Sequence, residues 1–197
     1  MSLSMTIRIV GIGGTVNSGS TTEQALRLAT AQADDEGADV MIFGGEYLGA
    51  LPHYRGAGYN PESGAELVEA VRQAHGVIIA APGYHGTISG LVKNALDYLE
   101  DLARDDRPYL DGRAVGLIAT AYGDQAKMST LQTLRGIVHA LRGWPTPMGA
   151  TIRTYHGLFS PDGECLEDRV RLQLEMVGRQ SLRGAQTLSS LVAKAER

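Results

Sequence analysis

The sequence has a single cysteine, Cys165, so it cannot form a disulfide bond within the chain. This suits a reducing compartment, and we expect a cytoplasmic protein. No apolar run approaches the ~20 residues that a membrane-spanning helix needs. The first residues also lack a basic region followed by a long apolar stretch. We therefore expect no membrane partner and no secretion signal.

Long runs of lysine or arginine are also missing. The chain has 18 Lys and Arg against 22 Asp and Glu, which gives a formal net charge of −4. Proteins bind nucleic acids through basic stripes, so we expect no nucleic-acid partner.

Residues that could carry nucleophilic or metal chemistry are scattered. No two of the five histidines have the spacing of metal ligands, and no Gly-x-Ser-x-Gly motif occurs. Cys165 has no histidine or second cysteine near it, which favours a structural role. We predict no metal site and name no catalytic residue.

The sequence does contain a regular alternation of strand and helix patterns. Apolar, β-rich runs predict strands at residues 7–12, 39–43, 76–81, 114–119 and 148–153. Helical patterns cover residues 20–36, 89–103, 125–141 and 166–194, and a further helix opens at 60–62. Residues 44–60 are expected to be irregular. We expect one domain over residues 1–197, with 165–197 as a C-terminal helix and 1–5 outside the ordered part, because Met5 is a second candidate start.

This alternation predicts a doubly wound α/β fold, in which helices cover both faces of a parallel sheet. Ligands of such sheets bind beyond the carboxyl ends of the strands. The segments that leave those ends are residues 13–22, 82–86 and 120–123. We therefore predict the binding site where these three segments meet.

The first of these segments is rich in glycine, serine and threonine and leads into a helix. Its backbone N–H groups and the helix N-terminus favour an anion. Ser20 stands where a P-loop has its lysine, and Val16 stands where a dinucleotide-binding loop has its third glycine. The segment is thus expected to be a neutral cradle for one monophosphate. The alternative is that its hydroxyl groups only cap the helix.

The second segment lies between a buried strand and a helix. Gly83 and Gly86 allow a close approach of the backbone to a ligand, and Tyr84 and His85 offer flat rings. Backbone N–H groups here can donate to the pyrimidine edge of a flavin. The alternatives are that Tyr84 only packs and that His85 is a solvated loop side chain.

Residues 81–98 contain the pattern Pro-x-Tyr-x-x-x-x-x-Gly-x-x-Lys-Asn-x-x-Asp, which resembles a signature of the NAD(P)H-dependent FMN reductase family. The first segment resembles the Gly-Ser-x-Arg-x-x-Ser-x-Asn phosphate loop of that family, and residues 51–54 resemble its Leu-Pro-x-Tyr. The resemblance spans about residues 7–150. It implies a flavodoxin-like, three-layer α/β/α sandwich with a five-stranded parallel sheet in the order 2-1-3-4-5.

The resemblance also implies FMN as the cofactor and NADPH or NADH as the electron donor. It places the first segment at the FMN phosphate and the other two at the flavin ring. The implied phosphate residues are Thr15, Asn17, Ser20, Thr21 and Thr22. The implied ring residues are Pro82, Gly83, Tyr84, His85, Gly86, Thr120, Ala121, Tyr122 and Gly123.

Three positions depart from the family pattern. Asn17 stands where the family has the loop arginine, Gly83 where it often has glutamate, and Tyr122 where its loop is rich in glycine. Loss of the arginine charge predicts modest FMN affinity, so FMN can serve as a substrate as easily as a prosthetic group.

From this resemblance we expect transfer of a hydride from NAD(P)H to flavin N5, and then of electrons to free FMN, a quinone, an azo dye or a metal ion. A flavin-binding electron carrier or regulatory module without NAD(P)H turnover is the alternative. A doubly wound protein that binds another phosphorylated metabolite is a third hypothesis.

The resemblance further implies a homodimer or tetramer, in which a partner chain supplies part of the pocket. Tyr47, Tyr54 and Tyr59 are candidates for such contacts, and surface packing is the alternative. Lys93 and Asp97 are four residues apart on a predicted helix and can pair. We expect these two residues and Asn94 to have a structural or interface role.

Overall fold

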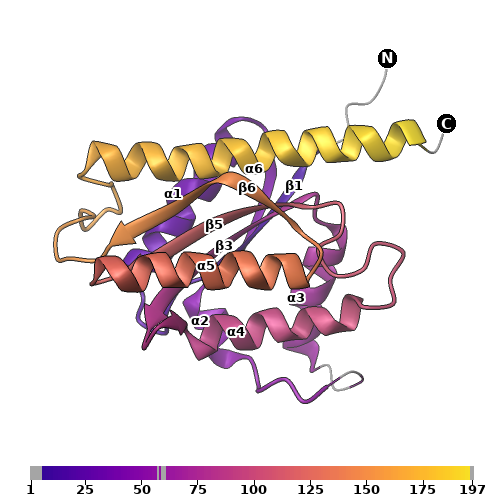
Figure 1. The fold of residues 1–197 in the computed structure, drawn as a ribbon, viewed down its shortest axis with the longest axis horizontal. Coiled ribbons are helices and arrows are strands. Elements are labelled where there is room, and N and C mark those ends of the chain that lie inside the picture. The colour runs from indigo at the N-terminus through magenta and orange to yellow at the C-terminus, as the bar shows by residue number, and fades with distance from the viewer. Residues whose placement is uncertain (1–5, 57, 59–60, 196–197) are drawn as a thin grey trace.

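The structure is a computed structural model that describes residues 6–56, 58 and 61–195. The prediction for residues 1–5 lies outside the described residues. Strands and helices alternate along the described chain (Figure 1). They are β1 (Arg8–Gly13), α1 (Thr21–Asp35), β2 (Asp39–Phe43), α2 (Gly45–Ala50), α3 (Glu62–Gln73), β3 (Gly76–Tyr84), β4 (Thr87–Ile88), α4 (Gly90–Asp97), the 3-10 helix η1 (Tyr98–Leu102), β5 (Ala114–Ala121), α5 (Asp124–Ala140), β6 (Trp144–Arg153) and α6 (Asp168–Ala195).

The five long strands form a parallel sheet in the order β2-β1-β3-β5-β6. This is the predicted order 2-1-3-4-5 once the strands are counted along the chain, so the predicted flavodoxin-like sheet is confirmed. The unpredicted strand is β4, which has two residues and pairs antiparallel with the end of β3. The central strands β3 and β5 are buried on both faces, which explains their nearly continuous apolar sequence.

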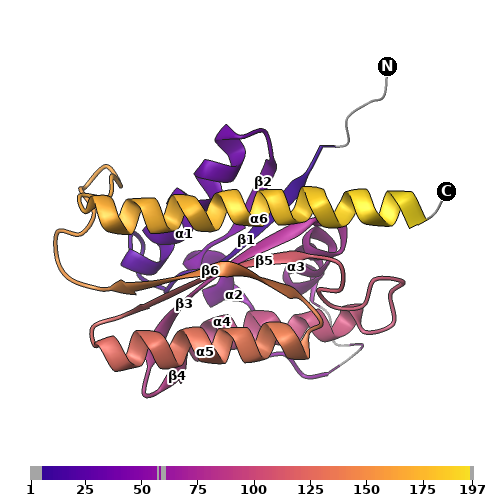
Figure 2. The same cartoon turned by 45° about the horizontal axis from the view of Figure 1, so that its top comes forward.

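Helices cover the two faces of the sheet and complete the three layers (Figure 2). On one face α1 and α6 pack against each other and bury side chains such as Leu26 and Val177 against Ile78 of β3. On the other face α3, α4 and α5 bury residues such as Leu67 and Leu134. Burial of this apolar surface on both faces is the main term that stabilises the sandwich. None of the described helices has the length and apolar character needed to cross a membrane.

Three predicted elements differ from the structure. Residues 44–60 were expected to be irregular, but they contain α2, whose six residues include two glycines and give a weak helical pattern. The helix predicted over residues 89–103 divides into α4 and η1. The last strand begins at Trp144 rather than at residue 148, because β6 is an edge strand and so tolerates Pro145 and Pro147.

Candidate functional site

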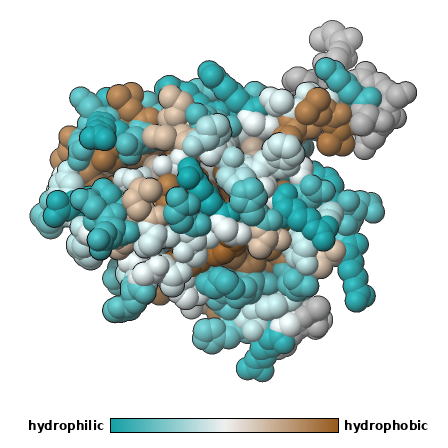
Figure 3. All heavy atoms as spheres, in the orientation of Figure 1, coloured by the Kyte–Doolittle hydropathy of each residue, from teal (hydrophilic) through white to brown (hydrophobic). Residues whose placement is uncertain are grey.

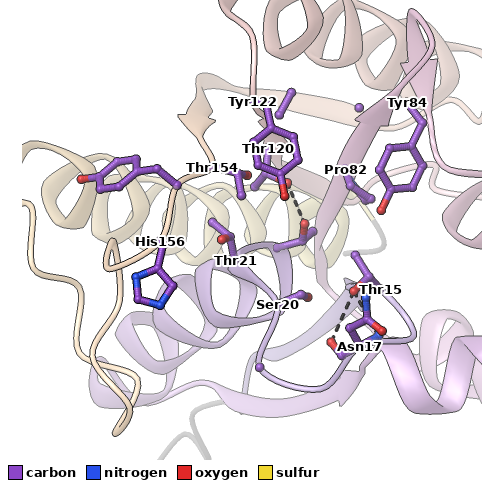
Figure 4. Close-up of a pocket in the computed structure, with 15 residues that line it drawn as sticks. Thr15, Asn17, Ser20, Thr21, Pro82, Tyr84, Thr120, Tyr122, Thr154 and His156 are labelled. Atoms are coloured by element: carbon purple, nitrogen blue, oxygen red, sulfur yellow. Dashed lines mark hydrogen bonds between the residues drawn. The ribbon is translucent and has the colours of Figure 1, made fainter.

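A pocket of about 400 Å³ opens beyond the carboxyl ends of β1, β3, β5 and β6 (Figure 4). Its position is the one expected for a ligand of a doubly wound sheet. Its volume lies within the ~300–1,000 Å³ of small-molecule sites. The pocket is lined by Thr15, Asn17, Gly19, Ser20, Thr21, Thr22, Pro82, Gly83, Tyr84, Thr120, Ala121, Tyr122, Thr154, Tyr155 and His156.

The loop between β1 and α1 is held in place from outside the pocket by α2. A Cβ atom on Gly45 would lie 1.7 Å from the Thr15 carbonyl oxygen, so only glycine allows α2 to pack so closely against this loop. Within the loop, the Thr15 hydroxyl accepts a hydrogen bond from the Asn17 N–H at 3.2 Å and lies 3.3 Å from the Asn17 carbonyl oxygen, to which it donates. These contacts fix the backbone of Asn17 and leave its side-chain amide at the pocket.

The N-terminus of α1 faces the same pocket. Ser20 caps the helix, and its hydroxyl oxygen accepts a hydrogen bond from the Glu23 N–H at 3.3 Å. Within the described residues, the N–H groups of Thr21 and Thr22 have no acceptor, as is usual in the first turn of a helix. These donors and the partial positive charge of the helix end suit an anion.

Thr22 has a second contact that the sequence did not indicate. Its side chain is buried, and its hydroxyl oxygen lies 2.6 Å from that of Thr120 on β5. This hydrogen bond joins α1 to β5 beneath the pocket. The Thr22 hydroxyl is therefore engaged by the protein, whereas the Ser20 hydroxyl only accepts from the Glu23 N–H and keeps its own proton to donate.

The second predicted segment is not a loop over its whole length. Residues 82–84 belong to β3, which turns back into β4 through His85 and Gly86. The backbone angles φ of these two residues are 48° and 92°, as a two-residue hairpin turn requires. His85 and Gly86 form the tip of the hairpin and are not among the residues that line the pocket, whereas Tyr84 is.

Gly83 contributes only its backbone to the pocket. A Cβ atom at this position would lie 2.3 Å from the Thr130 hydroxyl oxygen on α5, so the structure leaves no room for a side chain. This accounts physically for glycine at a position where the family pattern often has glutamate. Tyr84 follows with its side chain half exposed at the pocket mouth.

The end of β5, the neighbouring strand of β3, forms the wall next to Tyr84 (Figure 4). Thr120 and Ala121 belong to the strand, and the Tyr122 ring stands over the pocket with 78% of its surface exposed. Gly123 is the N-cap residue of α5 and is not among the residues that line the pocket. The Ala121 carbonyl accepts a hydrogen bond from the Thr154 N–H at 2.8 Å and so connects this wall to the next one.

Residues directly after β6 form a further wall of the pocket that the sequence did not predict, namely Thr154, Tyr155 and His156. Gly19, in the loop between β1 and α1, is a lining residue that was not predicted either. The Tyr155 hydroxyl donates to Glu167 Oε2 at 2.9 Å, which raises the pKa of that tyrosine. A signal was available, because the last predicted parallel strand must end at the same edge of the sheet as the others.

Charge is nearly absent from this pocket. Among its lining residues in the described part of the chain there is no lysine, arginine, aspartate or glutamate. Within the same residues, no group of histidine, cysteine or acidic side chains could hold a metal ion. Cys165 is buried away from the pocket, its thiol donates to the Glu167 carbonyl oxygen at 3.5 Å, and burial raises its pKa.

The tyrosines of residues 44–60 pack on their own chain. The Tyr47 ring lies 4.7 Å from that of Phe43, and its hydroxyl donates to the Ser63 carbonyl. The Tyr54 ring lies 5.2 Å from that of Tyr98, and its hydroxyl donates to Asp101 Oδ1 at 3.2 Å. Tyr59 lies outside the described residues. For Tyr47 and Tyr54, packing is therefore the interpretation that the structure favours.

The helix part of the second motif holds this same segment. Asn94 Oδ1 accepts a hydrogen bond from the Tyr54 N–H at 2.9 Å, and its Nδ2 donates to the Pro52 carbonyl at 3.0 Å. Lys93 and Asp97 form the predicted ion pair on the surface of α4. Asn94 thus has a structural role, and Lys93 and Asp97 form the pair that their spacing predicted.

The model of the NADPH-dependent FMN reductase family matches residues 7–156, which confirms the resemblance seen in the motifs. The chain is 27% identical over 164 residues to the NADPH azoreductase of Bacillus sp. (strain OY1-2), a match that covers 82% of this chain and 84% of the relative. It is 28% identical over 173 residues to the FMN-dependent NADPH-azoreductase of Staphylococcus haemolyticus (strain JCSC1435), with 83% and 86% covered.

Solved structures support the fold. FerB, a flavoenzyme NAD(P)H:(acceptor) oxidoreductase from Paracoccus denitrificans, has a TM-score of 0.75 at 17% identity, with 92% of this chain and 98% of that chain covered. The apo form of the NADH:FMN oxidoreductase EMOB has a TM-score of 0.71 at 25% identity, with 94% and 91% covered.

Proposed function

The chain belongs to the NADPH-dependent FMN reductase family, and from this premise we propose that it binds FMN, takes electrons from NADPH or NADH, and passes them to a small acceptor. The observation that carries the proposal is the pocket at the carboxyl ends of the parallel strands. It joins an anion-binding helix end to a wall of open aromatic rings. FMN combines the same two features, a phosphate and a flat ring.

The residues of the pocket fit the two ends of this cofactor. At the phosphate end we propose Thr15, Asn17, Ser20 and Thr21. Ser20 and Thr21 offer hydroxyl groups, Asn17 its side-chain amide and Thr21 a free backbone N–H, while the Thr15 hydroxyl holds the loop through its hydrogen bonds with Asn17. At the ring end, the backbone of Gly83 is open to a ligand, because the side-chain direction at this residue points toward α5 and away from the pocket. The proposed ring residues that line the pocket are Pro82, Gly83, Tyr84, Thr120, Ala121 and Tyr122.

When bound, FMN supplies the two-electron chemistry, and the chain supplies position and electrostatics. Backbone N–H groups at the end of β3 would donate to the ring, and the tyrosines at the mouth would limit access of water and shape the acceptor site. As acceptors we propose flat aromatic molecules first, an azo dye or a quinone, because the open rings of Tyr84, Tyr122 and Tyr155 stand at the mouth. Two relatives are named azoreductases, which supports this class. Free FMN and metal ions are the other acceptors to test.

We further propose a single cytoplasmic domain over residues 1–197 that assembles as a homodimer or tetramer. Support for assembly comes from α6, where hydrophobic side chains reach the surface near both ends of the helix (Figure 3). Leu172 and Met176 are exposed there, as are Leu191 and Val192. Analytical ultracentrifugation tests the assembly, and a monomer at micromolar concentration contradicts it.

One experiment tests the activity. The purified chain is mixed with FMN, freed of excess flavin, and titrated with NADPH or NADH without oxygen while the visible flavin absorption is followed. We expect flavin to remain bound and to bleach, and an added azo dye or quinone to restore the colour. Failure to bind FMN contradicts the proposal. Binding without bleaching by either nucleotide favours a flavin carrier or module without turnover.

A further inference from the structure

The proposed phosphate end of the pocket has donors but little charge. A phosphate monoester carries about −1.5 to −2 charges near pH 7, and the α1 N-terminus offers only about half of one positive charge. Asn17, Ser20 and Thr21 are neutral, and no lysine or arginine lines the pocket within the described residues. A bound FMN phosphate would therefore be poorly neutralised by the loop and the helix alone.

His156 is the one lining residue that can carry a positive charge. In Figure 4, Ser20 and Thr21 lie between Asn17 on one side and His156 on the other, whereas Tyr84 stands at the far end of the pocket. Within the described residues, the imidazole of His156 has no hydrogen-bond or ion-pair partner. It is exposed and therefore available to a ligand.

The segment that carries His156 is anchored on both sides of it. The preceding Tyr155 hydroxyl donates to Glu167 Oε2 at 2.9 Å. Two residues later, Leu158 is buried in the core, and its carbonyl accepts a hydrogen bond from the Leu166 N–H at 2.9 Å. These contacts keep the loop, and with it His156, beside the N-terminus of α1.

Several charged groups near this end of the sheet lie outside the pocket, as Glu167 does, which accepts the hydrogen bond of Tyr155. Arg27 forms an ion pair with Glu23 at 2.6 Å on the surface of α1. The pKa of Asp124 is lowered first by its hydrogen bond with Lys127 and also by the charge of Arg153. None of these residues lines the pocket, so none of them replaces the charge that His156 can supply.

We propose that the His156 imidazole donates to the FMN phosphate from the side opposite Asn17 and, when protonated, supplies its positive counter-charge. The pocket then selects flavin phosphorylated at the ribityl end over riboflavin. This inference rests on the proposed function, since it assigns a residue to the same FMN site. His156 is a binding residue in this arrangement and takes no part in electron transfer.

The test compares the affinities for FMN and riboflavin. The full chain, freed of flavin, is titrated with each ligand in low-salt buffer at about pH 6, where histidines in general carry charge, and flavin fluorescence is followed. We expect His156→Asn to raise the Kd for FMN by roughly 5- to 20-fold, the value of a charge-assisted hydrogen bond at an exposed site. The Kd for riboflavin should change by less than about twofold, because it lacks the phosphate.

Two further variants sharpen the comparison. Asn17→Arg in the His156→Asn background brings a charge to the other side of the same helix end, so it should restore most of the FMN affinity and leave that for riboflavin unchanged. His139→Asn is the matched control, because His139 is an exposed histidine on α5 that does not line the pocket. It should leave both Kd values unchanged. His156→Gln should repeat the result of His156→Asn if the latter variant folds poorly.

The outcomes separate this inference from the proposed function. If the unmodified chain binds FMN and His156→Asn binds it equally well, the role of His156 is wrong and the proposed function stands. If the variant loses FMN and riboflavin to the same extent, His156 acts on the pocket structure and the inference also fails. If the unmodified chain binds no FMN, the proposed function falls and this inference falls with it.

Discussion

The tyrosines of this chain fall into two regions that use the same side chain in opposite ways. In the segment after β2, Tyr47 and Tyr54 pack their rings against Phe43 and Tyr98, and burial raises the pKa of both hydroxyl groups to about 12. At the pocket, Tyr84, Tyr122 and Tyr155 leave 49%, 78% and 45% of their surface exposed. A tyrosine-rich segment is thus no evidence of a site by itself, because Tyr47 and Tyr54 pack on their own chain, whereas the exposed rings lie at the pocket.

The largest effect is expected where the tyrosine rings pack on the chain itself. Tyr98→Ala should lower the free energy of unfolding by about 3 to 5 kcal/mol, because it opens a cavity under the Tyr54 ring. It also removes the 2.8 Å hydrogen bond to the Pro52 carbonyl. Urea denaturation measures this loss. The Kd for FMN, measured under conditions where the variant is folded, should change by less than about twofold. A large change in Kd with little loss of stability would overturn the division into two regions.

The next effect is expected beneath the pocket. Thr22→Val should cost about 1 to 3 kcal/mol of stability, because the buried Thr120 hydroxyl loses its 2.6 Å partner. The double variant Thr22→Val/Thr120→Val should lose clearly less stability than the sum of the losses in the two single variants, since both polar partners are then gone. Urea denaturation of the four proteins of this cycle gives the coupling. Simple additivity would show that the hydroxyl pair contributes nothing of its own.

A smaller effect depends on pH. Tyr54→Phe should cost about 1 kcal/mol near neutral pH, because the hydrogen bond to Asp101 is lost. Burial and, after it, the charge of Asp101 raise the pKa of Tyr54 above its ordinary value to about 12 in the folded chain. The stabilisation by the neutral phenol is therefore complete below about pH 10 and is lost as the pH rises toward 12. Urea denaturation at several alkaline pH values should show the gap between the original chain and the variant closing over this range. A constant gap would contradict the raised pKa.

The smallest effect on stability is expected at the open ring. Tyr122→Ala should change the free energy of unfolding by less than about 0.5 kcal/mol, because the side chain is largely exposed. The Kd values for FMN and riboflavin should rise by the same factor, roughly 2- to 10-fold, because both ligands present the same ring. Fluorescence titration checks this. A loss confined to FMN would place Tyr122 at the phosphate and would contradict the proposed orientation.

The fold and part of the site could be predicted from local patterns. The apolar runs of β3 and β5 and the Gly- and Ser-rich segment before α1 are visible in sequence because each reflects a local requirement: burial on both faces, or backbone freedom before a helix. The pattern did not show that residues 82–84 continue a strand and that His85 turns away. That result depends on the pairing of β3 with β4, which is a contact between segments.

By itself, the sequence determined the five parallel strands and the main helices between them, the family, and the neutral, hydroxyl-rich character of the first loop. The tertiary structure decided which side chains share the pocket. It placed Tyr155 and His156 beside the loop between β1 and α1, which is more than a hundred residues away in sequence. It also joined Thr22 to Thr120 and packed the rings of Tyr47 and Tyr54 against other rings of the chain. The physical reason is that strand and helix formation depends on neighbours along the chain, whereas the walls of a pocket depend on which strand ends the parallel sheet sets side by side.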